Sequence, residues 1–182
     1  MKFRALIYIS VLFLFSLSLF NGEILAQNKK VRVSPKAMVK QTVGFTDVTI
    51  DFSRPGVKGR EIWGGLVPLN KVWRAGANEA TKITFSEDVN VNGNSVKAGR
   101  YGFFAIPGED NWILIFNKVA DQWGAFEYNE AEDVLRIEAT PEEGYFQEWL
   151  DFTVTKASKT TAVVKLEWEK LKVPFEVEVS VE

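Results

Sequence analysis

Short stretches in which apolar and polar residues alternate constrain the fold of this 182-residue chain more than any other feature. Val48, Ile50 and Phe52 fall on one side of an extended segment, and no stretch longer than about eight residues has helical periodicity. Asn92-Gly93 joins two short alternating runs as a two-residue hairpin turn would. The strand candidates are residues 38–43, 47–52, 81–86, the hairpin 89–96, 101–107, 112–118, 134–139, 150–154, 164–168 and 173–179. We therefore predict an all-β, single-domain antiparallel β-sandwich or a flattened barrel.

One long segment, at about residues 54–80, interrupts the alternation. Proline and glycine residues break it into turns, and residues 61–67 are expected to form a short helical turn around Trp63 and Leu66. A connection of roughly 27 residues inside a compact domain is more often functional or disordered than a plain linker. Because the segment is rich in aromatic residues and has no low-complexity run, we expect it to be ordered and to carry a site.

The N-terminus has the pattern of an export signal. Lys2 and Arg4 precede an apolar run at residues 5–20, and a small-residue processing signal ends at Ala26. A retained membrane anchor is the competing interpretation, but the run of about 16 residues is shorter than the roughly 20 needed to span a bilayer. We expect a signal peptide at residues 1–26, a flexible basic leader at 27–36 and a β-sandwich domain at 37–182. The expected location is secreted or periplasmic, with no stable membrane anchor after cleavage.

Composition excludes several kinds of chemistry and one kind of partner. The chain has no cysteine and no histidine, which rules out disulfides, Ser-His-Asp and Cys-His catalysis, and zinc sites built on thiolate or imidazole. Cleavage removes Lys2, Arg4 and Glu23, so 22 bases against 24 acids become 20 against 23. This net negative charge argues against a nucleic-acid partner. We expect no metal and no cofactor.

The 54–80 segment concentrates cations next to an unusual Gly-Ala-Asn-Glu turn. Arginine binds carboxylate or phosphate with two parallel hydrogen bonds, so several cations near glycine turns can hold a small anion. The alternative is an internal network of ion pairs, in which Arg54 or Arg74 pairs with Glu79. Counting by two along the flanking strands places Arg54 and Glu79 on the core side, where the two can meet. The ligand-binding candidates in this segment are Arg54, Lys58, Arg60, Arg74, Asn78 and Glu79.

A second polar and aromatic stretch follows the strand candidate at 112–118. It contributes the candidates Asn117, Lys118, Gln122 and Trp123, which can complete a site with the first segment. Trp63, Trp73 and Trp123 are expected to be partly exposed, and exposed tryptophans can form a platform for a sugar ring. The alternative interpretation is a loop in which the amide side chains satisfy buried backbone groups.

Glu79 also supports a different kind of function. An inward-facing carboxylate has its pKa raised by desolvation and can then act as a general acid. Glycoside hydrolysis requires a second carboxylate, for which Asp51, Asp121 and Glu127 are candidates. Nothing in the spacing of these residues places them together.

Four ordered motifs resemble a known family. They are SRPGVKGREIWGGLVP, VWRAGANEAT, AGRYGFFAIPG and WILIFNKVADQWGAF, beginning at Ser53, Val72, Ala98 and Trp112. They are similar to those of a secreted bacterial family catalogued as domain of unknown function 2911, over about residues 34–179. The resemblance implies an extracytoplasmic single-domain protein and no particular activity.

Three functions therefore remain open. The leading hypothesis is a secreted or periplasmic protein that binds a small anionic or carbohydrate ligand at the candidate residues. The second is a glycoside-type hydrolase that uses Glu79 as general acid or base. The third is a structural or interaction module in which the cations and Glu79 form an internal salt-bridge lock.

Overall fold

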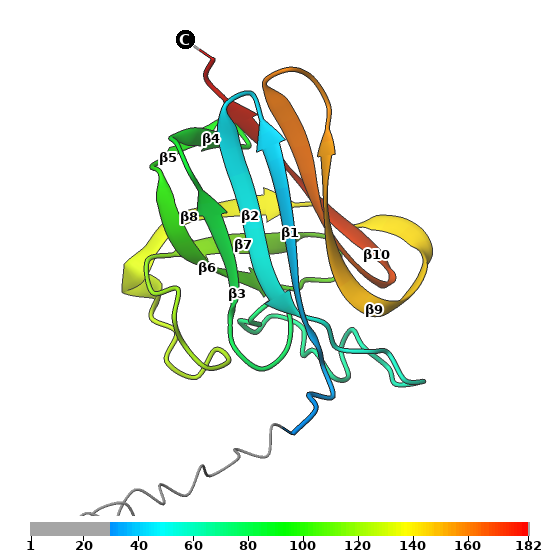
Figure 1. The fold of residues 1–182 in the computed structure, drawn as a ribbon. Helices are drawn as coiled ribbons and strands as arrows, with labels where there is room; N and C mark the ends of the chain where they lie inside the picture. Colours follow the sequence, from blue (N-terminus) through cyan, green and yellow to red (C-terminus); the bar gives the residue numbers. More distant parts are fainter. Residues whose placement is uncertain (1–29, 182) are drawn as a thin grey trace, which may run out of the picture. The chain divides into compact units, whose positions relative to one another are not determined.

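The computed structural model describes residues 30–181, and the unit Arg32–Glu182 is compact (Figure 1). The predicted signal peptide and the first residues of the predicted leader lie outside the described residues. In the described part of the chain, no helix is long and apolar enough to cross a membrane. Its regular structure consists of ten strands and one 3-10 turn at Glu130–Glu132, which confirms the all-β prediction.

Six strands form the first sheet, in the order β1-β2-β3-β6-β7-β8, and every pair is antiparallel. Alternation places the even-numbered apolar residues of β2 in the core, so that Val48, Ile50 and Phe52 are buried. The strands are β1 (Lys36–Val43), β2 (Thr46–Ser53), β3 (Thr81–Phe85), β6 (Gly99–Ile106), β7 (Trp112–Asn117) and β8 (Asp133–Ala139).

Four strands form the second sheet, in the order β5-β4-β10-β9, again antiparallel. Asn92 and Gly93 have φ values of 44° and 78°, which is the backbone of the predicted hairpin turn. The strands are β4 (Val89–Val91), β5 (Asn94–Val96), β9 (Glu142–Lys156) and β10 (Thr161–Val179).

The core lies between the two sheets. Phe52 of β2 packs edge-to-face on Phe152 of β9 with ring centroids 5.0 Å apart, and Phe103 of β6 stacks on Phe175 of β10 at 5.6 Å. The sheets keep separate strand orders with free edges, so the fold is a sandwich and not a closed barrel.

Four tryptophans form one cluster in this core, which we call the tryptophan cluster. Trp63 and Trp73 come from the 54–80 segment, Trp112 from β7 and Trp168 from β10, with ring centroids 4.8–6.4 Å apart. The expectation that Trp73 is partly exposed is wrong, because only 8% of its surface is accessible. The cluster therefore joins the long segment to both sheets.

Two sequence expectations about local structure are corrected. Residues 61–67 form hydrogen-bonded turns and a bridge between Trp63 and Val67 in place of a helical turn, because glycines at 64 and 65 interrupt it. The strands predicted at 164–168 and 173–179 are one continuous strand, β10, whose register with β9 shifts on either side of Glu169, a residue with a φ of 55°.

Candidate functional site

A cavity of about 310 Å³ lies where the 54–80 segment meets the N-terminal end of the described chain and β10. We call it the basic cavity. In Figure 1 the turns of this segment gather at the lower end of the sandwich, where the chain enters β1. Its walls are Val33, Ser34, Pro55, Gly56, Lys58, Arg60, Leu66, Val67, Trp73, Arg74, Gly76, Ala77, Asn78 and Trp168.

The wall from Arg74 to Asn78 is held as a closed loop. Thr81 N–H donates to the Arg74 carbonyl at 3.2 Å, and the buried Thr81 hydroxyl donates to the Ala75 carbonyl at 2.9 Å. Gly76 packs so closely that an added Cβ would lie 2.9 Å from the Thr81 hydroxyl and 3.1 Å from the Ser53 carbonyl. A glycine is therefore needed at position 76.

Three non-glycine residues of the segments that form the cavity wall have left-handed backbone: Lys58 and Asn78 line the cavity, and Ala75 lies between the lining residues Arg74 and Gly76. Lys58, Ala75 and Asn78 have φ values of 50°, 49° and 59°. Such a conformation costs about 1–3 kcal/mol, and strained positions of this kind are concentrated at functional sites. The wall is thus held in a shape that its residue types do not favour by themselves.

Two cations of the cavity contact neutral groups. Arg60 donates through Nε to the Val57 carbonyl at 3.1 Å and through a terminal nitrogen to the Gly56 carbonyl at 2.6 Å. The Lys58 ammonium lies 5.7 Å from the centre of the Trp149 ring. Among residues 30–181, no carboxylate forms an ion pair with either of them.

Arg74 is the least satisfied cation of the cavity. Its Nε–H is buried without a hydrogen-bond partner, and no acidic side chain of the described chain pairs with its guanidinium. Burial lowers the pKa of Arg74, but arginine stays protonated in proteins. A partly buried positive charge therefore lies at the wall without an ion-pair partner among residues 30–181.

Backbone donors add to this imbalance. Within the described chain, the N–H groups of Gly76, Ala77 and Asn78 donate to no carbonyl and no side chain. No Asp or Glu is among the described residues that line the cavity, although it has three cations. Consecutive free N–H groups beside cations form a site that favours a negatively charged ligand.

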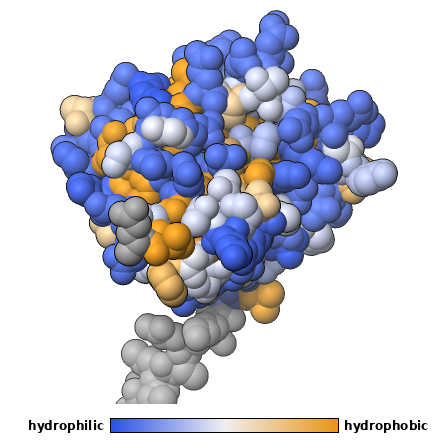
Figure 2. Space-filling view, turned by 90° about the horizontal axis from the view of Figure 1, so that it is seen from above, coloured by the Kyte–Doolittle hydropathy of each residue, from blue (hydrophilic) through white to orange (hydrophobic). Residues whose placement is uncertain are grey.

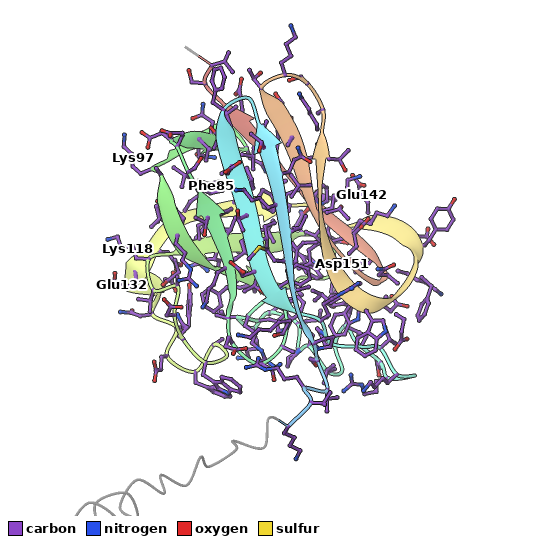
Figure 3. The ribbon with its side chains drawn as sticks, in the orientation of Figure 1. Phe85, Lys97, Lys118, Glu132, Glu142 and Asp151 are labelled. Atoms are coloured by element: carbon purple, nitrogen blue, oxygen red, sulfur yellow. The ribbon has the colours of Figure 1, made fainter. Side chains whose placement is uncertain are left out.

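Arg54 does not face the basic cavity. Its Nε donates to the Leu150 carbonyl at 2.8 Å, and a terminal nitrogen pairs with the Asp151 carboxylate at 2.9 Å. Asp151 is labelled on β9 in Figure 3. The alternative in which Arg54 pairs with Glu79 is therefore wrong, and Arg54 instead joins the end of β2 to the second sheet.

Glu79 pairs with the N-terminal segment and not with Arg74. Its two carboxylate oxygens accept from Arg32 at 2.6 and 2.8 Å, and Lys36 lies at 3.2 Å. The hydrogen bonds from Arg32 are the main cause that lowers the pKa of Glu79 to about 2. Glu79 therefore carries no proton near neutral pH, which removes the general-acid role considered for it. Arg32, expected in a flexible leader, is held to the domain by this pair.

Glu79 instead lines a second cavity, of about 420 Å³, which we call the mixed-charge cavity. Lys36, Asp51, Lys82 and Arg100 also line it, so acids and bases are both present. Lys82 and Arg100 both pair with Asp121. Most charges of this cavity are thus already balanced.

The chain can be placed in a family. Residues 34–177 match the family described as protein of unknown function (DUF2911). The chain belongs to this family. No curated protein and no solved structure matches the chain. The family description names no activity, so the function of this DUF2911 domain has to be argued from its own residues.

The second group of candidate residues lies beside the first but outside the basic cavity. Trp123 forms a backbone bridge with Glu79, and Gly124 N–H donates to the Asn78 carbonyl at 3.0 Å. Trp123 is 57% exposed. Lys118 is exposed on the side of the domain away from Asp151 (Figure 3).

The amide side chains of this DUF2911 domain's second stretch are structural. Asn117 is fully buried and donates to the Asn129 carbonyl and the Asp133 carboxylate, while its own oxygen accepts from Val119 N–H. Gln122 is buried and donates to the Val119 carbonyl. These contacts agree with the alternative interpretation, in which the amides satisfy buried backbone groups.

Sequence reasoning missed the parts of the basic cavity that come from the two ends of the chain. Ser34 accepts a hydrogen bond from the Asn78 amide at 3.2 Å through its backbone carbonyl, and Trp168 was predicted only as part of the strand at 164–168. No sequence pattern links these positions to the 54–80 segment. In the described chain, no group of three or more acidic side chains is arranged to hold a metal ion.

Proposed function

We propose that this domain binds a small anionic ligand in the basic cavity. The observation that carries the proposal is Arg74, a partly buried guanidinium with a buried, unpartnered Nε–H and no acidic partner among residues 30–181. Burying a charge without a partner is costly, and an anion in the cavity would offset that cost. Arg60, Lys58 and the free N–H groups of the Gly76–Asn78 loop would supply further contacts.

The salt-bridge lock, the sugar platform and the hydrolase have less support. A salt-bridge lock requires Arg54 or Arg74 to pair with Glu79, but Glu79 pairs with Arg32 and Lys36, and Arg54 pairs with Asp151. A sugar platform at the basic cavity requires a flat exposed ring there, whereas Trp73 and Trp168 are buried in the tryptophan cluster and the exposed Trp123 does not line this cavity. A hydrolase that uses Glu79 as its acid requires a raised pKa, and the pKa of Glu79 is lowered.

The proposal is tested by thermal unfolding of residues 27–182 with phosphate, sulfate, uronic acids and neutral oligosaccharides. A ligand at one hundred times its dissociation constant adds about 2.7 kcal/mol to the free energy of unfolding. We expect an anion to raise Tm in the wild type and not in Arg74→Met. Arg100→Met is the matched control, because Arg100 lines the mixed-charge cavity. A shift that survives in Arg74→Met and is lost in Arg100→Met would assign the anion to the other cavity and overturn the proposal.

We also propose that the domain acts after export through the signal at residues 1–26. The support is the basic start, the apolar run and the small residue at Ala26. Expression of the full chain in a bacterium with two membranes, followed by mass spectrometry of the periplasmic fraction, tests this. The expected product begins at Gln27, and a full-length product in the membrane fraction would contradict it.

A further inference from the structure

We infer that the ligand of the basic cavity is an organic anion with an apolar body, and not a bare inorganic ion. This inference rests on the proposed function and specifies its ligand class. It follows from the size of the cavity, from the mixture of groups on its walls and from the direction of the hydrogen bonds that those walls can make.

The volume exceeds what an inorganic ion needs. Pockets that hold small organic ligands typically measure about 300–1,000 Å³, and the basic cavity, at about 310 Å³, reaches that range. Phosphate and sulfate have only five non-hydrogen atoms each and would leave much of such a cavity to water. A ligand that fills the cavity therefore carries additional heavy atoms outside its charged group.

The walls offer apolar contacts for those additional atoms. Val67 and the stacked rings of Trp73 and Trp168 are buried at the cavity wall. Leu66 and Val33 also line the cavity but are 45% and 74% exposed. Small-molecule sites typically combine such apolar walls with a few polar groups that fix orientation. An apolar body would cover Leu66 and Val33 and remove apolar surface from water.

The polar groups of the walls determine which charged head group the ligand carries. The charged groups, Lys58, Arg60 and Arg74, are all donors, as are the free N–H groups of the Gly76–Asn78 loop. The Asn78 amide nitrogen is already used to hold the Ser34 carbonyl. A polyhydroxylated sugar needs acceptors as well as donors, whereas a carboxylate, phosphate ester or sulfate ester needs only donors. The ligand therefore carries such a group on an apolar body.

The test compares each inorganic ion with an aromatic counterpart. The protein is titrated separately with phosphate and phenyl phosphate, with sulfate and phenyl sulfate, and with acetate and benzoate. Tryptophan fluorescence reports the binding of each anion. We expect each aromatic anion to bind about tenfold or more tightly than its counterpart, since it buries the apolar walls. The head group that gives the tightest aromatic ligand identifies carboxylate, phosphate ester or sulfate ester.

A pair of variants separates the apolar contacts from the charged ones. Leu66→Ser should lower the affinity for phenyl phosphate about threefold or more and leave the affinity for phosphate unchanged. Phe45→Ser is the matched control, because Phe45 is 80% exposed in the turn between β1 and β2, at the upper end of Figure 1. That end, seen from above in Figure 2, is mostly hydrophilic with hydrophobic residues between.

The possible outcomes distinguish this inference from the proposed function. Equal affinity for phosphate and phenyl phosphate, both lost in Arg74→Met, would overturn the organic ligand and leave anion binding in place. No binding of any anion would overturn both. Equal affinity for phenyl phosphate and neutral phenol, unchanged in Arg74→Met, would also overturn both, because the cavity would then select the apolar body alone.

Discussion

Arg74 is a residue at which stability and binding are expected to oppose each other. Its guanidinium is half-buried, its Nε–H has no partner, and no described carboxylate balances its charge. Proteins keep such features where function requires them and accept a loss of stability there. The same substitution should therefore change folding and ligand binding in opposite directions.

Arg74→Met is predicted to leave the free energy of unfolding unchanged or to raise it by about 1–4 kcal/mol, as when buried charges are replaced by apolar residues. Arg54→Met provides the contrast, because Arg54 has a carbonyl and a carboxylate partner. Arg54→Met should lower the free energy of unfolding by about 1–3 kcal/mol, because these hydrogen bonds are lost. Urea unfolding of both variants measures the difference. A loss of about 3–5 kcal/mol in Arg74→Met would instead identify a structural ion pair.

Glu79 predicts a specific dependence of stability on pH. Its pKa falls from 4.5 to about 2 on folding, chiefly because Arg32 donates hydrogen bonds to its carboxylate. The folded state is therefore stabilised by ionised Glu79 above pH 4.5, and this contribution is lost as the pH falls from about 4.5 to about 2.

Glu79→Gln lacks this ionisation, so its stability should approach that of the wild type as the pH is lowered. We expect the difference in free energy of unfolding to shrink between about pH 6 and about pH 3. Denaturant unfolding at both pH values gives this difference directly. A difference that stays constant would show that the pair with Arg32 does not hold in solution.

Individual contacts were harder to predict than residue types. Lys58, Arg60, Arg74 and Asn78 were predicted from the sequence as one group, and the structure brings them to one cavity. The alternative that pairs Glu79 with Arg54 or Arg74 was wrong, because counting by two holds only inside a strand. β3 begins at Thr81, and Asn78 just before it has left-handed backbone, so the side-chain direction at 79 no longer follows from the strand.

At the scale of elements, the N-terminal residues 32–35 act as a strap across one side of the basic cavity. Arg32 pairs with Glu79, the Ser34 carbonyl accepts from Asn78, and the Pro35 carbonyl accepts from Arg54 N–H. Val33 and Ser34 form part of the wall. The position of the strap therefore affects the shape of the cavity.

Glu79→Asp tests this role because it keeps the charge but shortens the side chain, so both hydrogen bonds from Arg32 cannot form as before. We expect anion affinity to fall several-fold and exchange of the Arg54 amide proton to become faster, as the strap loosens. Titration and hydrogen exchange measure the two effects. Asp47→Glu, which alters the pair with Lys40 on β1, is the control and should change neither.

The strands show where the sequence was informative and where it was ambiguous. Val164, Leu166 and Trp168 occupy even positions, while Val173 and Phe175 occupy odd ones, so the phase of the alternation changes between them. The sequence pattern predicts two separate strands here, at 164–168 and 173–179. The structure accommodates it without ending β10: Glu169 has left-handed backbone, and the register with β9 shifts on either side of it, where β9 carries the additional residues.

At the scale of the whole molecule, the tryptophan cluster connects both sheets and the 54–80 segment. Trp168→Ala should therefore lower the free energy of unfolding by about 3–5 kcal/mol. Trp123→Ala is the matched control, because that side chain is 57% exposed, and should stay within about 0.5 kcal/mol of the wild type. Urea unfolding followed by circular dichroism measures both. Similar losses in the two variants would show that the cluster has no special role.

The architecture was predictable as a whole, whereas the cavity was not. Alternation is a local property, so the antiparallel sandwich could be predicted from stretches such as 47–52 and the Asn92-Gly93 turn. The cavity depends on Ser34 and Trp168 meeting the 54–80 segment. Contacts over such separations in sequence leave no local pattern.

The same separation determines when the cavity can exist during folding. Its walls run from Ser34, near the start of the domain, to Trp168 in β10. Contacts between distant parts of a chain form late, since each requires a long loop to close first. A chain that is still being synthesised or is only partly folded therefore lacks the binding site. Binding of an anion would show that β10 has already packed against the rest of the domain.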